Sequence, residues 1–166
     1  MIRTARLLLR DARESDLADL HAIFGDPRAM RYWDRPAHGD IAETRAVLDE
    51  LMAPNRTQRE DYVLEFEGRC IGKAGLWRAP QLGYILHPDA WGQGLMTEAL
   101  AAILPRCWSR FPQMPAILAE LDPRNAASIR LLDRFGFTRT ALRQQDFLYG
   151  GTTWCDTAVY TLPRPA

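Results

Sequence analysis

The sequence predicts an α+β (mixed α/β) domain built on one predominantly antiparallel sheet of about seven strands flanked by helices. Three observations support this fold class. The chain has 166 residues, which suits a single domain over residues 1–166 with one continuous core. Hydrophobic residues make up 47% of the chain and charged residues 25%, as is ordinary for a globular protein. Along the chain, the spacing of apolar residues switches between a helical period and a strand period.

The N-terminal third is predicted to contain one strand followed by helices. The strand covers residues 6–10. Apolar residues recur at helical spacing over 15–24, and a Gly-Asp-Pro sequence then ends that helix. A second helical piece follows near 27–32. A third helix is predicted over 40–53, which begins at an aspartate that can cap it and ends before a proline.

The rest of the chain is predicted to consist of strands and two helices. Strands are predicted at 61–67, 70–78, 83–87, 116–121, 138–148 and 153–162, and helices at 95–109 and 125–135. Trp77 and Trp154 are expected to face the core. The last strand, 153–162, is either an edge that pairs with a second copy to form a homodimer or is covered within the domain.

The composition of the chain indicates which binding partners and which cellular location to expect. The formal net charge is zero, so no general attraction to nucleic acid or to an anionic membrane is expected. The longest apolar run near the N-terminus is Leu7–Leu9, which is too short for a secretion signal, and the default is a cytoplasmic protein. The cysteines Cys70, Cys107 and Cys155 are far apart, so neither a disulfide framework nor a metal site is expected. Lys73 is the only lysine.

The segment from Gly83 to Leu100, GYILHPDAWGQGLMTEAL, carries the first functional motif. A strand runs into a turn with Gly92 and Gly94, and a helix begins at once. The backbone N–H groups at such a helix start are unpaired, and together with the helix dipole they form an anion site. The two glycines leave the backbone open to a phosphate, here expected to be a pyrophosphate. Taken alone, the pattern is also explained by a strand-to-helix connection that needs a tight bend.

A second motif follows about thirty residues later. Asn125 can cap the predicted helix, Ser128 lies one turn further on, and Gly136 ends the helix before a phenylalanine. Each residue alone has an ordinary capping role. The two motifs together, in this order, are much more specific.

On these two segments the sequence resembles the GNAT superfamily of acetyltransferases, and most of all the branch of RimJ and RimL ribosomal-protein N-terminal acetyltransferases. The resemblance covers nearly the whole chain. It rests on residues 4–10, 26–27, 30–32, 83–84, 91–94, 97–99, 125, 128, 136–137, 151 and 156. Two positions depart from the usual phosphate motif. Trp91 replaces a glutamine or arginine, as is common in this branch, and Met96 replaces a small residue. Met96 therefore either adds bulk beside the pyrophosphate or turns away from it.

The resemblance implies a splayed strand pair that holds acetyl-CoA, and direct transfer of the acetyl group to a primary amine without an acyl-enzyme. The acceptor is a protein N-terminus or a small-molecule amine. The backbone near Leu86 is expected to hold the thioester carbonyl. The residues expected to bind acetyl-CoA are Ile85, Leu86, His87, Trp91, Gly92, Gln93, Gly94, Leu95, Met96, Thr97, Asn125 and Ser128.

The resemblance also suggests the residues that move protons. Ser128 is the candidate donor to the departing CoA thiolate, although a helix serine bonded to backbone explains it too. Asp146 occupies the place of an acidic residue in the branch and is one candidate base. Glu120 is the other, because its strand borders the gap. Asp146 and Glu120 are each also explained as surface carboxylates. Glu98 matches the branch too, but a favourable interaction with the helix dipole explains its place in the first turn of a helix.

The acceptor site is expected to be formed by residues 25–40 and the late strands. Its candidate lining is Tyr32, Trp33, Asp34 and Phe147, although core packing explains the aromatic residues equally well. A non-catalytic acyl-CoA-binding or sensing module is the alternative function. The bulk of Met96 and the shortness of Asp146, where a glutamate is expected, leave room for it.

Overall fold

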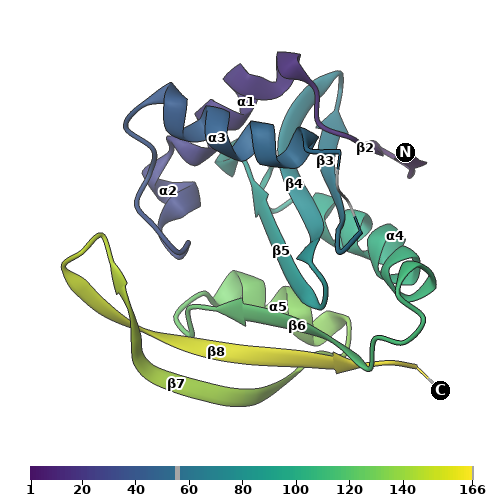
Figure 1. The fold of residues 1–166 in the computed structure, drawn as a ribbon, viewed down its shortest axis with the longest axis vertical. Coiled ribbons are helices and arrows are strands. Elements are labelled where there is room, and N and C mark those ends of the chain that lie inside the picture. The colour runs from purple at the N-terminus through teal and green to yellow at the C-terminus, as the bar shows by residue number, and fades with distance from the viewer. Residues whose placement is uncertain (55–56, 166) are drawn as a thin grey trace.

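The computed structural model describes residues 1–54 and 57–165, which form one mixed sheet with helices on both of its faces (Figure 1). The strands are β1 (Ile2–Arg3), β2 (Leu7–Arg10), β3 (Glu60–Phe66), β4 (Arg69–Arg78), β5 (Gln81–Leu86), β6 (Ala116–Leu121), β7 (Thr138–Tyr149) and β8 (Thr153–Pro163). The helices are α1 (Leu17–Phe24), α2 (Pro27–Met30), α3 (Ile41–Met52), α4 (Leu95–Arg110) and α5 (Ala126–Arg134), with short 3₁₀ helices at Glu14–Asp16 and Pro88–Ala90. None of these helices is long and apolar enough to cross a bilayer.

All the predicted strands and helices are present, and the order of the sheet is β1-β2-β3-β4-β5-β6-β8-β7. The strand β1 was not predicted, because two residues are too few to show an alternating pattern, so the sheet has eight strands. The last strand, β8, lies between β6 and β7 and is therefore covered within the domain. The edge on this side of the sheet is β7.

The expectation that Trp77 and Trp154 face the core is wrong. Their exposed fractions are 43% and 59%. Trp77 lies where the register between β4 and β5 shifts, and an ideal Cβ on Gly83 would lie 3.2 Å from its ring. Trp154 pairs with Leu148 across the β7–β8 hairpin, and Leu148 is exposed as well.

The sheet separates two hydrophobic clusters. Because successive side chains in a strand point to opposite faces, Leu64 and Leu86 belong to the cluster under α4 and α5, while Val63 and Ile85 belong to the cluster under α1 and α3. Both clusters are dominated by aliphatic side chains, many of them wholly buried. The two faces of β5 therefore lead to two different environments.

The contact between β5 and β6 is the irregular part of the sheet. Every other neighbouring pair is antiparallel, whereas β5 and β6 are parallel and pair only at Gln81–Leu118 and Leu82–Ala119. Beyond these two pairs the strands diverge, as Figure 1 shows, and the chain crosses between them through α4. Parallel neighbours need such a crossover. The predicted splayed strand pair is thus present, and it leaves the later half of β5 facing a gap.

Arg10 fixes the start of the α1 region to the sheet. Its guanidinium donates two hydrogen bonds to Asp16, at 2.8 and 2.7 Å, and one of 2.5 Å to Glu65 on β3. Burial opposes the ionised form of Asp16, but the hydrogen bonds from Arg10 and from the Arg13 backbone hold the pKa of Asp16 below its usual value. This buried ion pair orients the helices that cover the second cluster.

We expect Arg10→Met to lower the free energy of unfolding by about 3–5 kcal/mol, because it leaves Asp16 charged and buried without its partner. Urea unfolding at pH 7 measures the change. Arg28→Met is the matched control, since it breaks an ion pair with Asp26 at the surface and should cost much less. Equal losses in the two variants would contradict this interpretation of Arg10.

Candidate active site

The turn before α4 presents open backbone at the edge of the gap. Gly92 and Gly94 both have positive φ angles, 73° and 74°, which disfavour other residues. Gly94 is the N-cap of α4, and no side chain of the described residues caps this helix. A Cβ built on Gly92 meets nothing within 4 Å. The first amides of α4 are thus left without a side-chain partner, as an anion site requires.

The first side chains of α4 point away from this turn. Leu95 and Met96 are 1% and 8% exposed and belong to the cluster under α4. Of the two alternatives for Met96, the structure shows the one in which the side chain turns away. Leu95 and Met96 therefore offer backbone groups, not side chains, to a ligand at the turn.

Hydrogen bonds from the N-terminal segment hold this glycine turn in place. Arg6 donates to the Gln93 carbonyl at 3.0 Å and to Glu98 at 2.7 Å, and Thr4 donates to Glu98 at 2.5 Å. Burial alone would raise the pKa of Glu98, but the hydrogen bonds from Thr4 and Arg6 lower it. Glu98 is therefore a charged structural residue in the first turn of α4.

The end of β5 presents its backbone to the gap. His87 N–H donates to the Ile71 carbonyl on β4 at 2.8 Å. Because successive N–H groups of a strand point to opposite edges, the Leu86 N–H points towards the gap. The Leu86 carbonyl accepts a hydrogen bond of 3.1 Å from the Trp91 indole, which is half exposed. Trp91 thus connects the glycine turn to the end of β5.

Ser128 and Asn125 lie at the start of α5, but their side chains have different partners. Asn125 caps the helix, because its Oδ1 accepts a hydrogen bond of 3.1 Å from the Ser128 N–H. The Ser128 hydroxyl lies near the phenol of Tyr84 on β5, and its effect on the pKa of Tyr84 opposes that of burial. Burial raises the pKa of Tyr84 to about 12, so the phenol is protonated at neutral pH. Tyr84 was part of the sequence resemblance, but nothing in the sequence predicted its contact with Ser128.

The two candidate bases belong to one network. Arg143 on β7 donates to Glu120 at 2.7 Å and to Asp146 at 2.8 Å. Asp146 also accepts a hydrogen bond of 2.7 Å from Thr157. The hydrogen bond with Glu120 raises the pKa of Arg143, against the effect of burial. Arg143 and Thr157 were not predicted, since an arginine or a threonine in a strand carries no sequence mark of such a role.

A bulge in β7 turns Asp146 into this network. Arg143 pairs with Thr157 and Phe147 with Cys155, so residues 144–146 lie opposite Asp156 alone. Gln145 has a φ of 46°, and its N–H donates to Asp156 at 2.9 Å. Asp156, which the resemblance marked without a role, therefore stabilises the bulge.

The predicted acceptor residues come from two segments that the fold brings together. The Tyr149 hydroxyl donates to the Met30 carbonyl at 3.2 Å, which joins the β7–β8 hairpin to α2. Phe147 on this hairpin is half-buried. Trp33 packs edge-on against Phe24, with ring centroids 6.1 Å apart, and so supports the core as well.

The other two predicted acceptor residues are held by arginines. Arg31 lies over the Tyr32 ring, 5.2 Å from its centroid. Asp34 is exposed and pairs with Arg35 at 3.1 Å.

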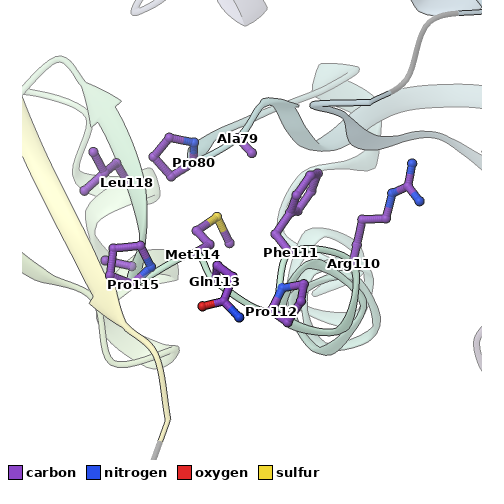
Figure 2. A pocket seen from close by; sticks show the side chains of 10 residues that line it. Ala79, Pro80, Arg110, Phe111, Pro112, Gln113, Met114, Pro115 and Leu118 are labelled. Atoms are coloured by element: carbon purple, nitrogen blue, oxygen red, sulfur yellow. The ribbon is translucent and has the colours of Figure 1, made fainter.

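Two surface cavities lie away from the gap. One of 580 Å³ is largely apolar and is lined by Ala79, Pro80, residues 110–116 and Leu118, at the paired end of β5 and β6 (Figure 2). The other, of 550 Å³, is bordered by His21, Asp26, Arg28 and His38 beside α1. Neither contains the residues predicted to bind acetyl-CoA or to transfer protons.

Comparison with known proteins identifies the family. The profile of the acetyltransferase (GNAT) domain matches residues 6–138, and the chain belongs to this family. The activity predicted from the sequence, N-acetyltransferase, is thereby confirmed at the level of the family.

The chain is similar to known proteins over almost its full length. It is 25% identical to the uncharacterised N-acetyltransferase YoaA of Bacillus subtilis over 99% of this chain and 97% of that protein. A Salmonella typhimurium acetyltransferase that modifies the N-terminal serine of ribosomal protein L7/L12 has a TM-score of 0.81 at 22% identity, covering 98% of this chain and 97% of that one. Spermidine N-acetyltransferase from Vibrio cholerae, solved with CoA and spermine, has a TM-score of 0.79 at 16% identity, with 96% of both chains covered.

We expect Asp156→Ala to lower the free energy of unfolding by about 1–2 kcal/mol, because the Gln145 N–H in the bulge loses its acceptor. Thermal unfolding followed by circular dichroism measures the change. Asp133→Ala removes an exposed aspartate from α5 and should leave stability nearly unchanged. The role of Asp156 in the bulge is refuted if both variants melt at the wild-type temperature.

Proposed function

We propose that this protein transfers an acetyl group directly from acetyl-CoA to a primary amine. The observation that carries the proposal is the divergence of β5 from β6, beside a helix start that no side chain caps. One end of this gap offers amides for a pyrophosphate, and the other offers the Ser128–Tyr84 pair and the two carboxylates. The relatives support acetyl-CoA as the donor, since the Vibrio enzyme was solved with CoA.

In this proposal the donor is held mainly by backbone. The amides of residues 92–97 bind the pyrophosphate, and Gly92 lets it approach because no side chain stands there. The Leu86 N–H points into the gap and binds the thioester carbonyl, whose oxygen gains negative charge as the amine attacks. The Trp91 indole donates a hydrogen bond to the Leu86 carbonyl and so holds this peptide in place.

Ser128 serves as the proton donor to the thiolate. The amine nitrogen forms a bond to the acetyl carbon, the C–S bond breaks, and the thiolate takes a proton. We assign that proton to the Ser128 hydroxyl, and the nearby protonated phenol of Tyr84 is the group that replaces it. The nearby phenol of Tyr84 also favours this role over that of a serine bonded to backbone.

Asp146 is our proposed base, with Glu120 as its competitor. The acceptor must lose a proton before it attacks, and a carboxylate near the gap can take it directly or through a water molecule. Asp146 is held by Thr157 and Arg143, whereas Glu120 bonds, among the residues that the structure describes, to Arg143 alone. Two fixed hydrogen bonds orient Asp146 better than one orients Glu120.

The acceptor class we propose is primary amines. A ribosomal protein N-terminus and spermidine, the acceptors named for two relatives, both contain such an amine. We place the acceptor between α2 and the β7–β8 hairpin, beside Tyr32, Trp33, Asp34 and Phe147. Assignment to the RimJ/RimL-like branch, a cytoplasmic location and a homodimer also stay predictions.

Gly92→Ala tests the donor site, and Gly68→Ala is its matched control. Both glycines have positive φ, 73° and 79°, and at both an added Cβ meets nothing within 4 Å. Each variant should lose about 1–2 kcal/mol of stability from backbone strain. Calorimetric titration with CoA should show binding weakened about tenfold or more in Gly92→Ala only. Equal affinities in the two variants would remove the turn from the donor site.

Ser128→Ala and Asp146→Asn test the proton transfers. We expect each to lower kcat by about 10²-fold or more, because general acid and base catalysis contribute at least that much. Tyr84→Phe should have a smaller effect, and CoA affinity should stay unchanged in Asp146→Asn and Tyr84→Phe. The assay is release of the CoA thiol with a panel of N-terminal peptides and small amines.

The result also separates the enzyme from the alternative function. If only Asp146→Asn were fully active, the base would be Glu120 or a water molecule. Tight CoA binding by the wild type without turnover of any amine would favour a non-catalytic acyl-CoA-binding module.

A further inference from the structure

The peptide bond between Gln93 and Gly94 lies in the glycine turn and is held at its carbonyl end. The Arg6 guanidinium donates a hydrogen bond of 3.0 Å to the Gln93 carbonyl. This peptide is trans, since the one cis peptide bond among the described residues is Ala79–Pro80. In a planar trans peptide the carbonyl and the N–H point in opposite directions. The Gly94 N–H therefore points away from Arg6.

The Gly94 N–H is free to bind a ligand, because it donates to no residue that the structure describes. Arg6 directly precedes β2, and β3 and β4 separate β2 from β5 in the sheet. Arg6 thus reaches the turn from the strands on the far side of β5 and not from the gap. Its bond to the carbonyl leaves the N–H on the other side of the turn.

The hydrogen bond from Arg6 selects one of two orientations of this peptide. Glycine accepts both signs of φ, and Gly94 has a φ of 74°. Rotation of the peptide by about half a turn would exchange the places of the Gln93 carbonyl and the Gly94 N–H. A carbonyl oxygen on the ligand side would repel an anion, whereas an N–H attracts one. By holding the carbonyl, Arg6 keeps the N–H on that side.

Arg6 is itself fixed by Glu98 in the first turn of α4. The backbone N–H and the Nε of Arg6 both donate to this carboxylate, each at 2.7 Å, and Thr4 donates to it as well. The ion pair also balances a negative charge that would otherwise oppose an anion at the helix start. Arg6 therefore connects the first turn of α4 to the peptide that precedes it.

We propose that Arg6 is a positioning residue for the donor, which aims the Gly94 N–H at the pyrophosphate of acetyl-CoA by holding the carbonyl of the same peptide. Arg6 acts without touching the donor, and the 3′-phosphate of CoA plays no part. This inference rests on the proposed function, because it takes the glycine turn as the pyrophosphate site. Its tests measure binding and need no turnover.

The first test compares ligands that differ in their phosphates. CoA, 3′-dephospho-CoA and pantetheine, which has no phosphate, are titrated into each protein by calorimetry, or by NMR where binding is weak. Arg6→Gln should weaken CoA and 3′-dephospho-CoA by the same factor of about ten, equivalent to about 1.4 kcal/mol, and leave pantetheine unchanged. Arg6→Lys can still donate to the carbonyl and should recover most of the loss. Arg3→Gln removes an exposed charge from the same segment and should match the wild type.

Three results of this test would overturn the inference. The first is an unchanged CoA affinity in Arg6→Gln. The second is an equal loss for pantetheine, which would indicate general damage to the protein. The third is a loss confined to CoA, which would place Arg6 on the 3′-phosphate.

The second test separates position from charge. In Glu98→Gln the side chain can still accept hydrogen bonds but carries no charge. If Arg6 holds the peptide, Arg6→Gln should cost about as much CoA affinity in the Glu98→Gln background as in wild type. Little or no loss in that background would mean that Arg6 only balances the charge of Glu98, and the inference would be wrong.

The third test uses the wild type alone, in case Arg6→Gln does not fold. In amide NMR spectra of ¹⁵N-labelled protein, CoA and 3′-dephospho-CoA should each move the Gly94 N–H signal to lower field, as a new acceptor does. Pantetheine should not move it, and the signal of Gly68, in the turn between β3 and β4, should respond to none of them. A Gly94 signal that ignores both nucleotides overturns the inference. If CoA moves it but no amine is acetylated, the proposed function fails and the role of Arg6 stands.

Discussion

The parallel pairing of β5 with β6 is the constraint on which the arrangement of this molecule depends. Two antiparallel strands could have been joined by a short turn, but parallel neighbours require the chain to travel back along the sheet. Here α4 makes that return, so its N-terminus must lie beside the C-terminal end of β5. The turn between them is short, and both of its glycines adopt positive φ. Because the strands pair at only two positions and then separate, the helix start, the Leu86 peptide and the first turn of α5 all border the same gap.

The sequence predicted the local elements well because their signals are local. Asp40 caps α3 as predicted, where Glu43 completes a capping box, and α4 begins directly after the predicted glycine turn. The alternation of Tyr62, Leu64 and Phe66 revealed β3. Such features depend on residues within a few positions of one another, so one sequence is enough to read them.

Contacts between distant segments were harder to predict. Tyr84 and Ser128 are far apart in the chain, as are Arg143 and Glu120, and none of these residue types indicates its partner. Trp77 and Trp154 were misplaced for a related reason: a register shift and an exposed hairpin decide their exposure, and neither follows from hydrophobicity. The family resemblance selected Ser128, Asp146 and Glu120 as candidates, but the structure alone shows the polar groups that hold each of them.

The bulge in β7 has a consequence for how this protein behaves in solution. β7 is a long edge strand, and an edge with free N–H and C=O groups is a template on which other chains can add and aggregate. Three residues opposite one partner bend the strand, and the charged pair of Arg143 and Asp146 lies at the bend. A foreign strand could pair with either half of β7 but not with its whole length. The irregularity that orients a candidate catalytic carboxylate thus also protects the exposed edge against uncontrolled growth of the sheet.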